Sequence, residues 1–240
     1  MKKLKIPLST IIITLNEEKN LPILLNALNK QTVSPAEIIV ADAGSKDKTL
    51  DIARKYHCRI IKGGKPPVAR NNGAREALQE RLLFLDADTL PNSKFFLESL
   101  YREVNENHYD CATCDNIPRS RKKIYEGLFI GYNLMQRFNQ YTPYPIASGP
   151  CIYCTKKAFN GVGGFPEDMK YAEDSEFVRR VKKKGYSFGI LEEPKIQISV
   201  RRFETDGINK TMKKAIGFYL TGQKNIDYNF GHHHENKQKD

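Results

Sequence analysis

Four short apolar runs within the first 86 residues limit the folds open to this chain. The runs are LSTIIITL at 8–15, EIIVA at 37–41, CRIIK at 58–62 and LLFLD at 82–86. The first run is rich in β-branched residues and has little polar alternation, which is typical of a strand buried on both faces. The sequence therefore predicts four strands in its first third.

Helical patterns separate these runs. After the first run, leucines recur at the spacing of a helix: Leu21, Leu24, Leu25 and Leu28. DKTLDIARKY follows the second run, and a stripe of small residues (Ala69, Gly73 and Ala77) follows the third. Strands that alternate with helices are joined by right-handed crossovers, so we expect an α/β fold with a mostly parallel central sheet flanked by helices.

The rest of the chain is less regular. Helical patterns cover about 93–106, 122–139, 173–184 and 207–220, and strands are predicted near 109–114, 149–154, 187–191 and 196–200. GVGGFPEDM, at 161–169, has the composition of a loop. Since no repeat or long linker divides the chain, we expect a single compact domain over 1–206. Its halves would be about 1–90 and about 91–206, and 207–240 would form an amphipathic helix and a polar tail.

Composition and charge exclude some classes of protein. Of the 240 residues, 40% are hydrophobic and 28% are charged, which fits neither a disordered chain nor a membrane-embedded one. The formal net charge of +11 favours an anionic partner, either nucleic acid, a phosphate-bearing metabolite or an acidic lipid surface. The basic, apolar start lacks a small-residue cleavage site, so we expect a buried strand there and a cytoplasmic protein.

Four of the five cysteines form two short motifs. Cys111-x-x-Cys114 and Cys151-x-x-Cys154 have the internal spacing of zinc ligands. Both motifs fall in predicted strands, where residues i and i+3 face opposite sides. We therefore expect buried, reduced cysteines, and zinc binding is the alternative.

Polar residues gather where the predicted strands end. Ligands of open parallel sheets bind beyond the carboxyl ends of the strands. The residues found there are Thr14, Asn16 and Glu17, then Asp42, Gly44 and Ser45, then Gly63, Gly64, Lys65 and Arg70, and finally Asp86 and Asp88. Acids, glycines and bases thus meet at one rim. This convergence predicts a binding site rather than four unrelated caps and turns.

Asp86 and Asp88 are the most specific part of this rim. Two carboxylates two residues apart, just after a buried strand, can reach one divalent cation. Hard oxygen ligands suit Mg²⁺ or Mn²⁺, which also binds the phosphate oxygens of a substrate. Lys65 and Arg70 would add positive charge for a diphosphate. The alternative is a solvated turn that ends the strand.

Six segments of the chain together resemble family 2 glycosyltransferases of the GT-A fold. They are ITLNEEKNL, IIVADAGSKDKT, ARNNGAREA, FLDADT, GGFPED and YAEDSEFVRRVKKKGY, in the family's order over roughly residues 6–190. The resemblance implies a GT-A-like domain that moves a sugar from a nucleoside-diphosphate sugar, such as a UDP- or GDP-sugar, to a hydroxyl acceptor with inversion. It also implies a divalent metal, Mg²⁺ or Mn²⁺. The first half of the domain would hold the donor and the second half the acceptor.

The resemblance assigns roles around the donor. Thr14 and Glu17 lie in the segment that surrounds the nucleoside, and Asp42 matches an acid that contacts the base or ribose. Arg70 matches an arginine near the pyrophosphate. Asp86 and Asp88 match the metal motif, with Asp88 as the direct ligand. Leu15 and Ala41 depart from the family pattern, so the nucleoside stays open.

The second half supplies the residues implied in catalysis. Glu173 and Asp174 match the family's catalytic acidic pair, with Asp174 as the base. Acids at a helix start also stabilise the helix dipole wherever they occur, which is the structural alternative. As a base, one carboxylate would accept the proton of the acceptor hydroxyl. Arg201 and Arg202, in ISVRRFETDG, resemble a basic-aromatic motif that closes over the diphosphate.

Three other function classes remain as alternatives. LLFLDADTL resembles the strand-Asp-x-Asp-x-Thr start of a phosphohydrolase family, but Thr89 comes one residue early. A nucleotidyltransferase acting on sugar phosphates would need a glycine-rich loop after the first strand, and TLNEEKN has no glycine. A nucleic-acid binder fits the charge but not the acidic rim.

Two segments are both amphipathic and basic. In the helix predicted at about 207–220, apolar residues share one side and lysines the other: Ile208, Met212, Ala215, Ile216, Tyr219 and Leu220 against Lys210, Lys213 and Lys214. In the second segment, Arg119, Arg121, Lys122 and Lys123 precede Ile124, Leu128, Phe129, Ile130 and Tyr132. These stripes either cover the core or face outward onto an anionic membrane leaflet. The outward reading would make the protein peripheral at the cytoplasmic face, with an acceptor that is lipid-linked or a precursor of a cell-envelope glycan.

Overall fold

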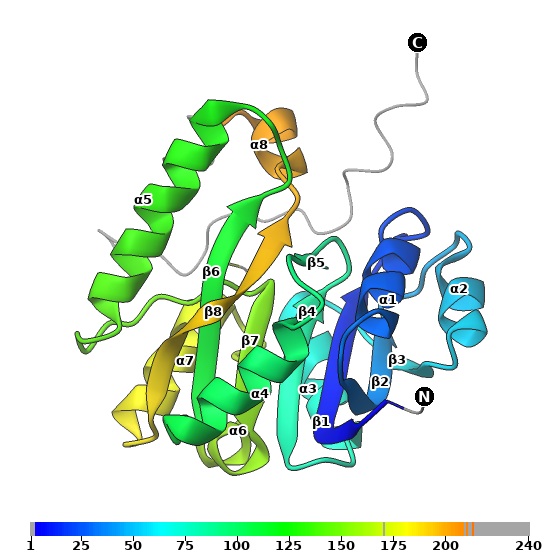
Figure 1. Cartoon of the computed structure of the whole chain (residues 1–240), viewed down its shortest axis with the longest axis horizontal. Helices are drawn as coiled ribbons and strands as arrows, with labels where there is room; N and C mark the ends of the chain where they lie inside the picture. The colour runs from blue at the N-terminus through cyan, green and yellow to red at the C-terminus, as the bar shows by residue number, and fades with distance from the viewer. Residues whose placement is uncertain (1–2, 170, 209, 211–212, 214–240) are drawn as a thin grey trace.

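One eight-stranded sheet, in the order β3-β2-β1-β4-β7-β6-β8-β5, runs through the part of the chain that the structure describes (Figure 1). The structure is a computed structural model and describes residues 3–169, 171–208, 210 and 213. Strands β1 (Lys5–Thr14), β2 (Ser34–Asp42), β3 (Arg59–Lys62) and β4 (Arg81–Asp86) pair in parallel. These are the four strands that the sequence predicts.

Three helices connect these strands as expected: α1 (Leu21–Asn29), α2 (Thr49–Lys55) and α3 (Pro66–Glu76). The four leucines of the α1 stripe are all buried. In α3, a Cβ on Gly73 would collide with the side chain of Ile11 on β1. The small-residue stripe therefore lets α3 lie directly on the sheet.

The second half of the sheet changes direction. β7 (Cys151–Thr155) is antiparallel to both β4 and β6 (Cys111–Pro118), whereas β6 and β8 (Phe188–Ile198) are parallel. The two-residue β5 (Leu90–Pro91) is antiparallel to β8. The α/β fold class is thus confirmed, and the sheet is mixed. The remaining helices are α4 (Phe96–Glu106), α5 (Lys123–Asn139), α6 (Lys156–Val162), α7 (Glu173–Lys183) and α8 (Arg201–Asp206).

Three details differ from the expectations. The strands predicted at 187–191 and 196–200 are one strand, β8, whose pairing with β6 jumps from Leu191 to Lys195 because extra residues bulge out there. Helix α6 was not predicted; Thr155 caps it by accepting a 3.2 Å hydrogen bond from the backbone N–H of Ala158. Most of the helix predicted at 207–220 lies outside the described residues.

Apolar clusters cover both faces of the sheet. α1 and α4 bury leucines against one face, among them Leu24, Leu28 and Leu97. On the other face Phe165 stacks on Phe177 of α7, with ring centroids 4.1 Å apart. Anchored on both sides, the sheet fixes the carboxyl ends of its strands. Among the described helices, none is long and apolar enough to cross a bilayer.

The cysteine motifs are split between the two faces. Cys111 lies opposite Cys154 in the β6–β7 register and belongs to the cluster under α6 and α7. Cys114 and Cys151 belong to the cluster on the other face. All four are buried free thiols, and the two members of each C-x-x-C motif do not share a face, as the strand argument predicts.

Candidate functional site

The ends of β1, β2 and β4 lie side by side and carry the predicted rim residues. Thr14 is in register with Asp42, and Ile13 with Asp86. Asp42 is 7% exposed and accepts four hydrogen bonds: from Thr14 Oγ1 (2.8 Å), Ser45 Oγ (2.5 Å) and the backbone N–H groups of Gly44 (2.9 Å) and Ser45 (2.8 Å). A carboxylate has about four lone-pair sites. Asp42 therefore organises the loop after β2.

The loop after β1 is tied to the loop after β2. Asn16 adopts a left-handed φ of +55° and accepts a 2.8 Å hydrogen bond from the N–H of Lys46. The backbone N–H of Glu17 donates to Thr49 Oγ1 (2.8 Å). A non-glycine residue at positive φ needs surroundings that hold it there. The paired loops thus fix the direction in which Glu17 leaves the backbone.

Arg70 joins segments that lie far apart in the chain. Its side chain, on α3, is 3% exposed and forms ion pairs with Asp86 Oδ1 (2.9 Å) and Glu173 Oε1 (2.8 Å). It also donates to the carbonyl of Gly149 (3.3 Å), and its guanidinium lies 5.5 Å from the centre of the Phe165 ring. The negative charges of Asp86, Glu173 and Asp174 raise the pKa of Arg70 above its ordinary value. Arg70 is therefore a fixed cation between Asp86, at the end of β4, and Glu173, at the start of α7.

Asp174 lies beside this arginine at the start of α7. Its Oδ2 accepts from the N–H of Gly149 (2.6 Å), and its Oδ1 from the N–H of Ser175 (2.7 Å). Burial, followed by the negative charge of Glu173, raises the pKa of Asp174 to about 7, although Arg70 opposes the shift. A carboxyl group with this pKa can exchange a proton near neutral pH.

The backbone around Asp174 is shaped for it. Ala172, just before α7, has a left-handed φ of +55°. A Cβ on Gly149 would lie 2.9 Å from Arg70 Nη2 and 3.0 Å from Asp174 Oδ2. Only glycine leaves both contacts undisturbed. Gly149 is not among the predicted site residues, and the turn-like Ser-Gly-Pro at 148–150, directly before a strand, was the available signal.

A second cluster forms around Asp88. Arg201 of α8 places Nη2 3.4 Å from Glu17 Oε1 and 3.5 Å from Asp88 Oδ2. Burial, then the negative charges of Asp86 and Glu17, raise the pKa of Asp88 to about 6. Burial also raises the pKa of Glu17. The structure thus brings Arg201 of α8 and Glu17, after β1, to the Asp86 and Asp88 pair that follows β4.

The remaining predicted residues lie around these clusters. Arg202 follows Arg201 on α8, and its positive charge opposes the rise in the pKa of Asp88. Lys65 is exposed at the start of α3 and joins none of the ion pairs found in the described part of the chain. Thr89 is buried and donates to the carbonyl of Asp86 (2.7 Å). Its hydroxyl is therefore used inside the turn, which weakens the phosphohydrolase alternative.

The acids around Asp88 fit a cation that is bound together with a ligand. Among the described residues, no group of three or more His, Cys, Asp or Glu side chains could hold a metal ion. Mg²⁺ typically uses one or two protein carboxylates and takes its other ligands from phosphate and water. Burial is the main cause of the raised pKa of Asp88, and the negative charges of Asp86 and Glu17 add to it. Asp86 and Asp88 therefore suit an open metal site, and not a closed one made by protein alone.

Comparisons with known proteins agree with this fold. The family model for glycosyl transferase family 2 matches residues 9–163. The poly(ribitol-phosphate) beta-N-acetylglucosaminyltransferase TarS of Staphylococcus aureus is 27% identical over 208 residues, which cover 81% of this chain and 35% of TarS. The 4,4'-diaponeurosporenoate glycosyltransferase of Staphylococcus haemolyticus is 31% identical over 137 residues, which cover 53% of this chain and 36% of the relative. The chain spans about a third of the length of these relatives.

Solved structures share the architecture. The TarS 1–349 crystal structure matches with a TM-score of 0.66 at 21% identity, covering 90% of this chain and 75% of that one. Its complex with UDP-GlcNAc matches with a TM-score of 0.64 at 24% identity, covering 80% and 58%. The mannosyltransferase PcManGT of Pyrobaculum calidifontis, in complex with GDP-Man and Mn²⁺, gives a TM-score of 0.67 at 21% identity, covering 88% and 64%. This likeness confirms the predicted glycosyltransferase-like fold.

Proposed function

Because the chain belongs to glycosyl transferase family 2, we propose that it transfers a sugar from a nucleoside-diphosphate sugar to a hydroxyl acceptor, with inversion. The observation that carries the proposal is the double ion pair of Arg70. This side chain links Asp86, at the end of β4, to Glu173, at the start of α7. Acids that can bind a cation, and through it a diphosphate, thus lie next to acids that can accept a proton. A sugar transferase requires both.

The donor would bind at the rim of the first half. Thr14, Glu17 and Asp42 would border the nucleoside, and Lys65, Arg70, Arg201 and Arg202 would supply positive charge near the diphosphate. The complexes of similar structures contain UDP-GlcNAc, UDP or GDP-Man, which supports a UDP- or GDP-sugar. Residues of about 1–90 would form this donor half within a domain over 1–206.

Asp88, as the direct ligand, and Asp86 would hold Mg²⁺ or Mn²⁺. The bound cation would neutralise charge on the departing nucleoside diphosphate. Arg201 now lies between Asp88 and Glu17. Arg201 would turn to the diphosphate when a donor occupies the site. The phosphate is the better partner for Arg201, and the cation is the better partner for Asp88.

Asp174 would be the general base. Glu173 pairs with Arg70 at 2.8 Å, whereas both oxygens of Asp174 accept only backbone N–H groups in the described contacts. Its pKa of about 7 suits proton transfer near neutral pH. Asp174 would take the proton of the acceptor hydroxyl as the oxygen attacks the anomeric carbon. Arg70 would stay beside it as the balancing positive charge.

The acceptor would come to the second half, about 91–206. We propose an acceptor that is lipid-linked or a precursor of a cell-envelope glycan, used at the cytoplasmic face of the membrane by a peripherally attached enzyme. The support is the basic charge of the chain and the family relation to TarS, whose name specifies poly(ribitol-phosphate). The amphipathic helix predicted over 207–220 lies largely outside the described residues and adds no support here.

Incubation with labelled UDP- and GDP-sugars, with Mg²⁺ or Mn²⁺, tests the proposal. We expect slow hydrolysis of one donor without acceptor, and faster sugar transfer when glycan or lipid alcohols are added. The same donor's nucleoside diphosphate should raise the melting temperature only with the cation, since a ligand stabilises the state that binds it. Pyrophosphate exchange would instead indicate a nucleotidyltransferase, and phosphate release from monoesters a phosphohydrolase.

A further inference from the structure

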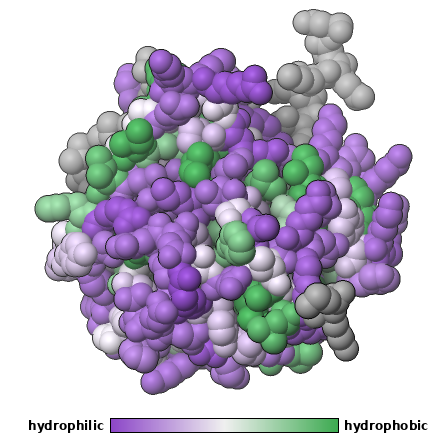
Figure 2. Space-filling view, in the orientation of Figure 1, coloured by the Kyte–Doolittle hydropathy of each residue, from purple (hydrophilic) through white to green (hydrophobic). Residues whose placement is uncertain are grey.

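The outward face of α5 is apolar. Ile130, Leu134 and Phe138 recur every four residues along the helix and are 60%, 64% and 74% exposed. Ile124 and Met135 are exposed beside them, and Tyr141 and Tyr144 continue the surface beyond the end of the helix. In Figure 2, hydrophobic residues follow the course that α5 takes along one edge of the molecule in Figure 1. We call these seven side chains the α5 stripe.

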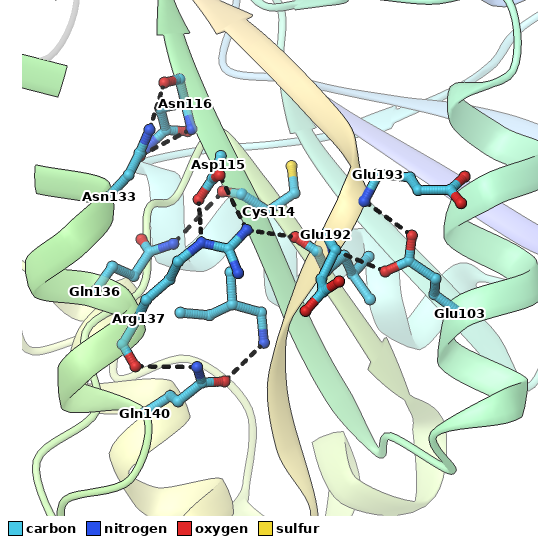
Figure 3. A network of polar contacts seen from close by, with 12 residues as sticks. Glu103, Cys114, Asp115, Asn116, Asn133, Gln136, Arg137, Gln140, Glu192 and Glu193 are labelled. Carbon is cyan, nitrogen blue, oxygen red and sulfur yellow. Dashed lines mark hydrogen bonds and ion pairs between the residues drawn. The ribbon is translucent and has the colours of Figure 1, made fainter. Parts of the chain in front are cut away.

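The inward face of α5 carries much of the polar character instead. Figure 3 shows how this side of the helix is attached to β6 and β8. Asn133 exchanges two hydrogen bonds with the backbone of Asn116 (3.0 and 2.9 Å). Arg137 binds both oxygens of Asp115 (3.1 and 2.9 Å) and the carbonyl of Leu191 (3.2 Å). Polar side chains thus hold the helix, although Tyr125 and Phe129 also pack inward near its start.

This arrangement reverses the usual one. A helix on the surface of a globular protein normally turns its apolar side to the core and its polar side to water. Contiguous exposed apolar surface marks a site of interaction with a protein or a membrane. The apolar residues that the sequence analysis noted in this helix divide between its two sides. Phe129 is buried and Leu128 packs against the same cluster, whereas Ile124 and Ile130 are exposed. The outward half of the pattern therefore needs a partner.

Basic residues stand at both ends of the α5 stripe. Arg121, Lys122 and Lys123 are exposed at its start. At its other end, Lys182 binds the carbonyls of Gln140 and Thr142, and the exposed Lys183 and Lys184 come next. A second copy of the chain placed across the stripe would bring these like charges together. An anionic surface would instead be attracted at both ends.

We propose that the α5 stripe lies on the surface of an anionic lipid bilayer, with its apolar side chains at the boundary between headgroups and acyl chains. The proposal names the surface by which the protein would attach to the membrane. Its link to a lipid-linked acceptor rests on the proposed function. Apolar side chains along one face, tyrosines at one end and flanking bases are the features of a helix that lies in the interface.

The same helix supports the segment that reaches the site. Phe203 of α8 contacts Tyr125 and Phe129 of α5, with ring centroids 5.9 and 6.0 Å apart. α8 also carries Arg201, which lies within 3.5 Å of both Glu17 and Asp88. A membrane in contact with α5 is therefore one helix away from the donor site. An acceptor carried on a lipid could reach the site without leaving the bilayer.

A single tryptophan tests the proposal, because the chain has none of its own. We would compare Phe138→Trp, on the stripe, with Leu78→Trp, which is equally solvent-exposed but lies in the connection between α3 and β4. With vesicles of phosphatidylglycerol and phosphatidylcholine, the emission of Phe138→Trp should move to shorter wavelength. It should not move with phosphatidylcholine alone, and Leu78→Trp should not respond to either.

Two further variants give the size of each contribution. In Phe138→Trp, changing Lys183 and Lys184 to Gln should weaken vesicle binding about fivefold per lysine, and high salt should do the same. Changing Ile130 and Leu134 to Ser should weaken it at least tenfold. Circular dichroism would check that these surface variants fold.

Other outcomes would overturn the proposal. No shift with anionic vesicles would do so, as would an equal shift with neutral ones. If the emission of Phe138→Trp without lipid moved to shorter wavelength as the protein concentration rose, a second copy would be covering the stripe. If the emission without lipid already lay at shorter wavelength than that of Leu78→Trp at every protein concentration, another part of the same chain would be covering it. No readout needs a donor or an acceptor, so failure here leaves sugar transfer untouched, and failure of sugar transfer leaves this result standing.

Discussion

Replacing Arg70 with Met should destabilise the fold more than any change at an exposed ion pair. Arg70 is buried, and its two ion pairs, at 2.9 and 2.8 Å, neutralise Asp86 and Glu173. Methionine has a similar shape without the charge, so the two acids would be left without their partner. Removal of one partner from a buried ion pair costs about 3–5 kcal/mol of unfolding free energy.

The expected loss can be converted into a melting temperature. In a chain of this size each kcal/mol lowers the melting temperature by about 2–4 °C. Arg70→Met should therefore melt roughly 6–20 °C below the wild type. Arg70→Lys should lose less, because it keeps the charge, but a lysine cannot match the fork of two donors. Urea unfolding followed by circular dichroism would give the free energies directly.

The pH dependence separates lost charge from lost packing. Arg70 lowers the pKa of Asp174, which burial otherwise raises. An acid with a raised pKa in the folded state binds its proton more tightly there than when unfolded, so stability falls as pH rises towards that pKa. Without Arg70 the fall should continue above pH 7. The deficit of Arg70→Met should thus be larger at pH 8.5 than at pH 6.

Arg54→Met is the matched control. Its pair with Asp51 is equally short, at 2.7 Å, but both side chains are exposed. Exposed pairs contribute about 0–1 kcal/mol, so this variant should melt close to the wild type at both pH values. If Arg70→Met lost no more than Arg54→Met, or if its deficit did not change with pH, the role of Arg70 as a buried counter-ion would be refuted.

Three other substitutions test the site. Asp88→Ala should fold normally and lose cation-dependent binding of UDP or GDP, and calorimetry that found unchanged affinity with and without Mn²⁺ would contradict the metal assignment. Asp174→Asn should lower sugar transfer about 10²–10⁴-fold while nucleotide binding survives. In the wild type the rate should rise with pH up to about 7 and then level off, because the base must be unprotonated, and this rise should vanish in the variant. Gly149→Ala should displace Arg70 and Asp174, so that transfer falls while melting changes less than in Arg70→Met.

The first half of the fold could be predicted because its signals are local. An apolar run and the leucine or alanine stripe that follows it are each read within a dozen residues, and parallel pairing then brings the polar strand ends together. Thr14, Asp42 and Asp86 lie at one edge for this reason. The sequence pattern could not predict the hydrogen-bond partners of Asp42, since its four hydrogen bonds depend on the conformation of the loop.

The second half was harder because its signals are short or long-range. α6 has only seven residues, too few for a clear helical period, and β5 has two. Arg70 and Glu173 are 103 positions apart, so no local pattern could pair them. In α5, Tyr125 and Phe129 pack inward near the start, but further along the helix polar residues face the sheet while Ile130, Leu134 and Phe138 face outward. The helical periodicity separates an apolar face from a polar face, but it does not show which of the two packs against the sheet.

The charges of the site explain why it should bind a cation and an anion together. Glu17, Asp86, Asp88, Glu173 and Asp174 lie around Arg70 and Arg201, and the charge of Arg202 also acts on Asp88. Burial and then the neighbouring acids raise the pKa values of Asp88 and Asp174, although the chain as a whole is basic. A diphosphate alone would be repelled by these acids, and a cation alone would have to compete with Arg201 for Asp88. Bound as a pair, the cation would contact the acids and the diphosphate would contact Arg201, so each would remove the obstacle to the other.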